Sequence, residues 1–104
     1  MLLVETLPEL ADELQSALQQ RNRLELAAQV RTLEIIERCR CGDDFCSSFY
    51  TQPKPEGSYG PGLETIELDA AIGMLILDVV QGKIAHVEVL NNDRNRQKLF
   101  AALP

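Results

Sequence analysis

The feature of the sequence that most limits its fold is a pair of apolar segments, Gly73–Val80 and Lys83–Leu90, separated only by Gln81 and Gly82. A two-residue connection of this kind is typical of a tight antiparallel β-hairpin. Successive side chains of a strand point to opposite faces of a sheet. Both faces of the first segment are apolar, with Leu75, Leu77 and Val79 on one face and Met74 and Ile76 on the other. We therefore expect both faces to be covered, the second by a helix or by another subunit.

Further strands are predicted before this hairpin. The segment Leu63–Leu68 is predicted as the strand that directly precedes it. From Leu33 to Cys41 the sequence follows a two-residue period, and FCSSFYT, which begins at Phe45, is predicted to pair with it. The turn residues Asp43 and Asp44 lie between the two segments. In this register Cys41 faces Cys46.

Helices are predicted at both ends of the chain. Apolar residues recur every three or four positions over Leu7–Gln20, and a shorter amphipathic pattern follows over Arg23–Arg31. Asn92 and Asp93 are suited to cap a short C-terminal helix. The predicted fold class is therefore α+β, a single domain over residues 1–104. It has two N-terminal helices, an antiparallel sheet of about five strands and a short C-terminal helix.

The charge of the chain limits its partners. The sequence has 10 Lys and Arg residues against 16 Asp and Glu, a net charge of −6. Nucleic acid and anionic membranes are bound through clustered basic side chains, so we expect neither as a partner. An acidic surface suits a basic protein partner. The first residues lack the basic and long apolar regions of an export signal, so we expect a cytoplasmic protein.

All three cysteines fall within CRCGDDFC, from Cys39 to Cys46. Zinc takes four ligands, and Cys39, Cys41 and Cys46 together with His86, the only histidine, make up that number. The spacing argues against zinc, because a C-x-C motif on a regular strand holds the Cα atoms of its two cysteines about 6–7 Å apart. A disulfide between Cys41 and Cys46 is a second interpretation, although a reducing cytoplasm disfavours it. Three reduced thiols packed beside the strand are the third.

His86 and Glu88 are two residues apart on a predicted strand and therefore share a face. The turn at Gln81–Gly82 is predicted to set this face against Leu75 and Leu77, with Asp78 on the opposite face. An ionisable pair beside apolar residues is either a site with shifted pKa values or an edge pair with its polar ends in water.

Enzyme signatures are not evident in the sequence. It contains neither a G-x-S-x-G elbow nor a G-K-[ST] phosphate loop, so an enzyme is the less favoured class. A cysteine nucleophile with His86 as its base is the one catalytic arrangement left open. The proline- and glycine-rich segment Gln52–Gly62 is predicted to be an irregular loop. Tyr59 lies in this loop and is a candidate anchor for a protein partner.

Two stretches of the chain resemble known sequences. CRCGDDFCSSFYT, followed by PEGSYGPG, is similar to a group of small uncharacterised bacterial proteins with a C-x-C-G-x-x-x-C motif. GMLILDVVQGKIAHVEVL looks like the strand pair of small bacterial domains of unknown function. Together they cover roughly the second two-thirds of the chain. The resemblance implies a compact single domain and brings no known activity or catalytic residue.

Two functions follow from these observations. The acidic charge, the sheet that is apolar on both faces and the irregular loop favour a protein-binding or regulatory module. Its partner is expected to be another protein or a second copy of the chain, bound through Tyr59, Met74 and Ile76. The alternative is a zinc-binding or thiol-redox module built on Cys39, Cys41 and Cys46.

Overall fold

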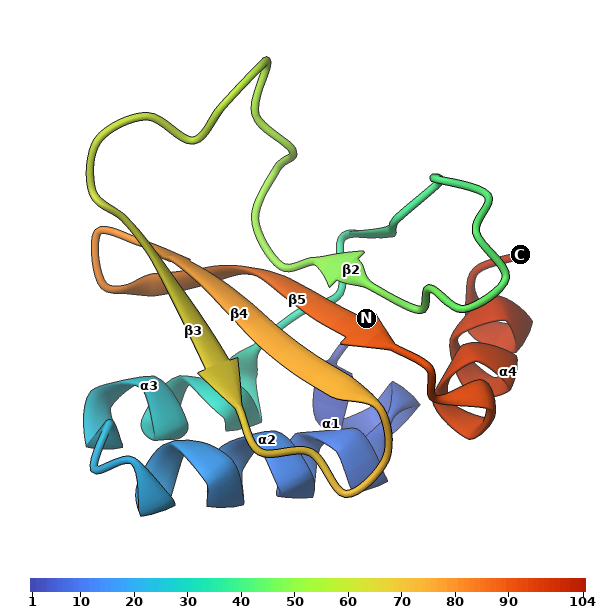
Figure 1. Cartoon of the computed structure of the whole chain (residues 1–104), viewed down its shortest axis with the longest axis horizontal. Coiled ribbons are helices and arrows are strands. Elements are labelled where there is room, and N and C mark those ends of the chain that lie inside the picture. Colours follow the sequence, from blue (N-terminus) through green and yellow to red (C-terminus); the bar gives the residue numbers. More distant parts are fainter.

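A five-stranded antiparallel sheet organises the computed structural model, which describes residues 1–104 (Figure 1). The strands are Glu37–Arg38 (β1), Phe49–Tyr50 (β2), Leu63–Leu68 (β3), Met74–Val80 (β4) and Lys83–Leu90 (β5), in the order β1-β2-β5-β4-β3. The helices are Leu3–Thr6 (α1), Pro8–Gln20 (α2), Leu24–Gln29 (α3) and Asp93–Ala102 (α4), with a 3-10 turn at Val30–Thr32. The α+β class, the antiparallel sheet and the C-terminal helix are confirmed.

The N-terminal part of the chain differs from the prediction in two ways. Helix α1 precedes the two helices that the periodicity predicts. The strand expected from Leu33 shrinks to β1, because the chain before β1 pairs with the N-terminus instead. Leu3 N donates to Leu33 O at 2.9 Å, and Ile35 N donates to Met1 O at 2.8 Å.

Helices α1, α2 and α3 lie together on one side of the sheet (Figure 1). The apolar stripe of α2 points inward, where Leu14 and Leu18 are fully buried. They belong to the same buried cluster as Leu77 and Val87 of the sheet, so the amphipathic pattern of α2 is a core pattern. No helix is both long and apolar enough to cross a lipid bilayer.

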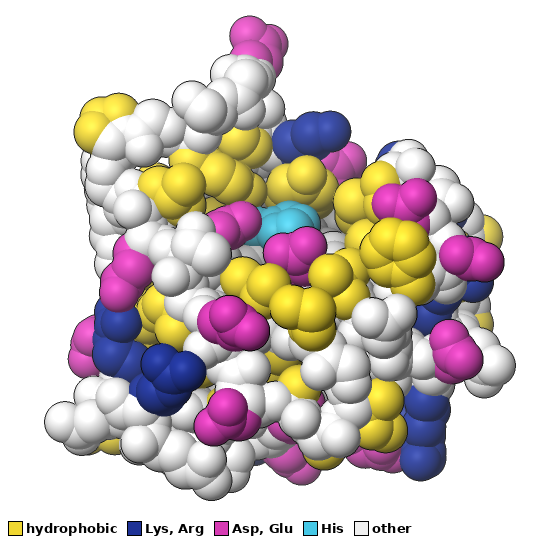
Figure 2. Space-filling model, in the orientation of Figure 1, with side chains coloured by type: hydrophobic (Ala, Val, Ile, Leu, Met, Phe, Trp, Pro, Cys, Tyr) yellow, Lys and Arg dark blue, Asp and Glu magenta, His cyan; other side chains and the backbone are white.

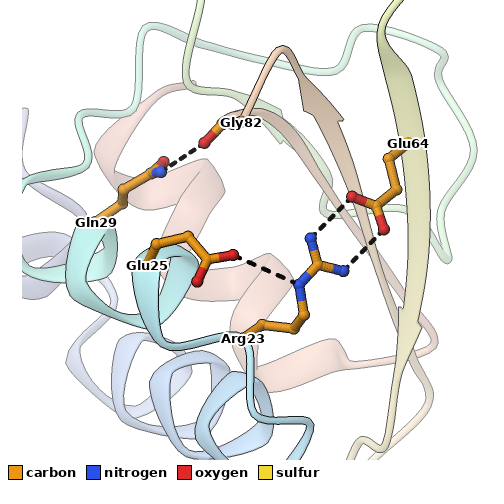
Figure 3. Close-up of polar contacts among 5 residues, drawn as sticks. All are labelled: Arg23, Glu25, Gln29, Glu64 and Gly82. Atoms are coloured by element: carbon orange, nitrogen blue, oxygen red, sulfur yellow. Dashed lines mark hydrogen bonds and ion pairs between the residues drawn. The ribbon is translucent and has the colours of Figure 1, made fainter.

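Polar contacts fix α3 against the strands (Figure 3). Arg23, which precedes α3, donates to both carboxylate oxygens of Glu64 on β3, each at 2.8 Å. Gln29 at the end of α3 donates to Gly82 O at 2.7 Å and accepts the amide of Ile84 at 3.1 Å. Bidentate arginine–carboxylate pairs are geometrically specific, so these contacts set where α3 sits on the sheet.

The β4–β5 hairpin turns at Gln81 and Gly82, as predicted, with φ values of 50° and 80°. Val79 pairs with Ile84 in the register that this turn dictates. The register then shifts by one residue, and Asp78 pairs with His86.

The residue that causes the shift is Ala85, a β-bulge. The Ala85 carbonyl accepts the amides of Thr51 at 2.9 Å and Gln52 at 3.3 Å, from the chain that leaves β2. A one-residue shift moves every later side chain of a strand to the other face. The prediction that His86 lies against Leu75 and Leu77 is therefore wrong.

The second face of the sheet, called here the open face, bears no helix of this chain (Figures 1 and 2). Met74 is 40% exposed on this face, and Ile76 is half-buried beside it. The histidine lies at its centre among apolar and acidic side chains (Figure 2). A covering helix is therefore not found, and a covering subunit stays a prediction.

Candidate metal centre

The three cysteines meet at the end of the β1–β2 hairpin. Their sulfur atoms all lie within 4.8 Å of one another. All three are free thiols; Cys46 is buried, Cys39 is half-buried and Cys41 is exposed. We call them the cysteine cluster.

The cluster forms because the chain leaves the extended conformation just after β1. Cys39 still pairs with the returning strand, through its amide and Ser48 O at 2.8 Å. Gly42 then takes a left-handed φ of 83°, and Cys46 N donates to Asp43 O at 3.2 Å. The expected separation of the C-x-C cysteines applies only to a regular strand, so this turn removes the objection that their spacing raised.

Ser48 holds the buried member of the cluster in place. Its hydroxyl oxygen accepts the amide of Val89 on β5 at 3.0 Å and lies 3.3 Å from Cys46 Sγ. The thiol of Cys46 donates to Ser48 Oγ, and because the hydroxyl has a rotatable proton of its own, it can donate to the sulfur once Cys46 is a thiolate. Ser48 therefore stabilises a thiolate at Cys46, and nothing in the sequence distinguished it from Ser47.

The thiols differ in acidity. Burial raises the pKa of Cys46, but hydrogen bonds from Ser48 and from the other two thiols outweigh it and lower this pKa below its ordinary value. The Asp43 amide lowers the pKa of Cys41, but desolvation and its bonds to Cys39 and Cys46 prevail and raise it to about 11. The cluster thus favours one thiolate, at Cys46, to which its neighbours donate.

A pocket of about 190 Å³ opens beside the cluster, with all three cysteines in its wall. Arg38, Arg40 and Arg96 line the same pocket, together with Phe100. Helix α4 contributes Arg96 and Phe100, so residues far apart in the sequence share this site. Sequence periodicity offered no signal for Arg96, since an arginine on a short polar helix is ordinary.

Comparison of the chain with known proteins found no matching family model, curated protein or solved structure.

His86, the fourth zinc ligand considered from the sequence, is not in the cluster. Its Nδ1 lies 3.4 Å from Asp78 Oδ2 on the open face, and its ring packs on that of Tyr50 at 4.5 Å. The prediction that Asp78 lies on the other face is wrong, because the bulge at Ala85 turns His86 toward it. His86 and Glu88 do share a face, as predicted.

None of the three residues considered for partner binding belongs to the cysteine cluster. Met74 and Ile76 are on the open face, where Ile76 pairs with Glu67 and Glu88 of the neighbouring strands. Tyr59 is half-buried in the loop between β2 and β3, which is irregular as predicted. Its hydroxyl oxygen is buried without a hydrogen-bond partner, and burial raises its pKa.

Replacing Ser48 by alanine is expected to weaken both the fold and the thiolate. The Val89 amide would lose its buried acceptor, which costs about 1–3 kcal/mol of unfolding free energy. The pKa of Cys46 would rise, because the hydroxyl no longer stabilises the charged sulfur. Urea denaturation measures the first effect, and the ultraviolet absorbance of the thiolate against pH measures the second.

Ser47→Ala is the matched control for this variant. Ser47 is equally buried, and its hydroxyl accepts a hydrogen bond from Asn95 at 2.9 Å without contacting Cys46. It should lose comparable stability and keep the wild-type thiolate titration. Equal titrations in the two variants would show that Ser48 does not act on Cys46.

His86 is expected to make the fold sensitive to mild acid. Burial lowers its pKa in the folded protein, although Asp78 and Glu88 act in the opposite direction. As the pH falls through the unfolded value of about 6.5, the unfolded chain takes up a proton that the folded protein resists. Stability should therefore decrease below that pH, and less so in His86→Gln. Thermal unfolding from pH 7.5 to 5.5 tests this, and identical slopes would contradict it.

Proposed function

We propose that this protein binds a zinc ion through Cys39, Cys41 and Cys46. The observation that carries the proposal is the convergence of three sulfur atoms within 4.8 Å. Thiolates are preferred ligands of zinc, with a metal–sulfur distance of about 2.3 Å. Tetrahedral coordination at that distance separates the sulfurs by about 3.8 Å. Side-chain rotations at the exposed Cys41 and half-buried Cys39 suffice to close the difference.

The surroundings of the cluster also support an ion. The hydrogen bonds that lower the pKa of Cys46 make its thiolate, the form that binds a metal, more accessible than that of an ordinary cysteine. Arg38, Arg40 and Arg96 offset the negative charge that three thiolates bring to one place. A disulfide between Cys41 and Cys46 would consume two ligands, so oxidation and metal binding exclude each other.

Cobalt titration of the reduced protein tests the proposal, because Co²⁺ substitutes for zinc and absorbs when thiolates bind it. We expect one cobalt per chain, a sulfur-to-metal charge-transfer band, and its loss on addition of one equivalent of zinc. His86→Gln is the matched control and should give the same titration, since His86 lies outside the cluster. Absence of the band, or its loss in His86→Gln, would overturn the three-cysteine site.

A second candidate function is binding of a basic protein partner at the open face. Met74 is 40% exposed there. Acidic side chains flank the apolar ones, because Ile76 pairs with Glu67 of β3 and Glu88 of β5. Asp78 is the next residue of β4 on the same face. Two copies of the chain would bring these carboxylates together, which is unfavourable. A partner that alternates apolar and basic residues would match both the apolar rows and the charge.

A short peptide that alternates valine and lysine is a direct test of this candidate. We expect amide chemical-shift changes at Met74 and Ile76 with this peptide and none with its valine–glutamate counterpart. An equal response to both peptides would contradict the charge argument. Dimerisation of the chain through this face, measured by sedimentation equilibrium, would replace the basic partner with a second copy.

A further inference from the structure

The cysteine cluster supplies three ligands to an ion that takes four. His86 is not within reach, the sequence has no other cysteine or histidine, and no carboxylate oxygen lies together with the three sulfur atoms. Structural zinc sites are closed by four protein ligands, whereas sites with three protein ligands leave the fourth position to an exogenous molecule. An ion held by Cys39, Cys41 and Cys46 therefore has a vacant position.

The pocket beside the cluster is the space into which a fourth ligand fits. Its volume of about 190 Å³ is room for a small organic molecule.

Charge in the pocket selects an anion. The three arginines and Asp43 leave two net positive charges in its wall. A zinc ion on three thiolates adds one negative charge, so the loaded site stays positive. This sign is unusual on a chain whose net charge is −6. It favours a negatively charged ligand over a neutral one.

Arg96 is the donor that lacks an acceptor. Its side chain makes no hydrogen bond or ion pair with the protein, and its guanidinium lies 4.2 Å from the centre of the Phe100 ring. Arg38 and Arg40 are already engaged: Arg38 donates to Leu103 O at 2.6 Å and to Cys39 O at 3.2 Å, and Arg40 donates to Pro104 O at 3.0 Å. An arginine held against an aromatic ring presents its donor fork to a carboxylate. Arg96 is thus prepared to receive one.

We infer that the pocket binds a small thiol that carries a carboxylate, with its sulfur on the fourth position of the zinc ion and its carboxylate on Arg96. This inference rests on the proposed zinc function. Sulfur is favoured at the ion because thiolates are common ligands of zinc, up to four on one ion. The carboxylate is favoured at the wall because Arg96 lacks an acceptor. The only bond broken in the ligand is S–H: its electron pair stays on the sulfur that binds the ion, and the proton passes to water.

Equilibrium dialysis of the zinc-loaded protein against an equimolar mixture of mercaptoacetate and 2-mercaptoethanol tests the inference. Both molecules bring one thiol on a short chain, and only the first has a carboxylate. We expect the retained protein to hold one zinc per chain and at least about tenfold more mercaptoacetate than 2-mercaptoethanol, as a charge-assisted hydrogen bond predicts. Equal retention of the two thiols, or of neither, would overturn the inference.

Arg96→Gln is expected to abolish the preference while one zinc per chain is retained. Arg94→Gln is the matched control, because Arg94 lies on the same helix, bonds Glu9 at 3.0 Å and does not line the pocket. A preference that persists in Arg96→Gln would contradict the role of Arg96.

If the dialysed wild-type protein holds no zinc, the proposed function itself fails. If the protein holds one zinc per chain but retains the two thiols equally, only the inference of an anionic ligand is refuted. The wild-type comparison decides this even if a variant does not fold.

Discussion

Gly73→Ala is expected to lower the free energy of unfolding by about 3–5 kcal/mol, a large part of the stability of a domain of this size. Gly73 has a φ of 68°, which an L residue adopts only with strain. A Cβ atom at this position would also overlap Leu90 O and lie 2.7 Å from Asn91 O. These atoms are backbone at the end of β5, so relief of the overlap requires movement of the sheet.

Gly57→Ala separates the two contributions to this effect. Gly57 also has a positive φ, of 82°, but a Cβ there meets nothing within 4 Å. It should therefore show only the conformational cost, about 1–2 kcal/mol. Urea denaturation of both variants measures the difference. Equal losses would mean that the close approach between Gly73 and Leu90 is not maintained in solution.

Cys46→Ser is expected to lower zinc affinity by at least about 100-fold, because partners outside the first coordination shell alone account for 10–100-fold. Cys46 is the buried member of the cluster, and its lowered pKa makes it the first thiolate available to the ion. Two remaining cysteines cannot hold zinc against water and chelator as three do. Competition with a chromogenic zinc chelator measures the loss.

The stability of the metal-free protein serves as the control for this variant. Serine is nearly isosteric with cysteine, and its hydroxyl can bond Ser48 as the thiol does. The metal-free Cys46→Ser protein should therefore unfold close to the wild-type midpoint. A full zinc load in this variant would end the proposal, because no fourth thiol is available to replace Cys46.

Local sequence pattern predicted most of the sheet correctly. The bounds of β3 and β5 were predicted to the residue, and β4 to within one. Alternation and turn chemistry specify these strands, and both depend on neighbouring residues alone. The pairing of Glu37 with Tyr50 and Arg38 with Phe49 is also the register that a turn at Asp43–Asp44 gives.

The first helix and the late start of β1 were not predicted, for a reason that is not local. The periodic segment from Leu33 is sufficiently apolar to form a strand. Its backbone instead bonds to Met1 and Leu3, and β1 begins only after that contact ends. The backbone pairing with the N-terminus here outweighs the local β-strand propensity, which depends strongly on context.

The sequence by itself determined that three cysteines lie close together, because they fall within one short hairpin. Only the tertiary structure decided what surrounds them. The bulge at Ala85, held by amides from the chain beyond β2, turns His86 onto the open face. His86 pairs with Tyr50, four residues along the strand pair from the bridge of Cys46 with Leu90, so it lies away from the cluster. Helix α4 brings Arg96 to the cluster from the far end of the chain. Periodicity specifies the face of a residue within its own element, whereas a bulge or a docked helix depends on contacts between elements distant in sequence.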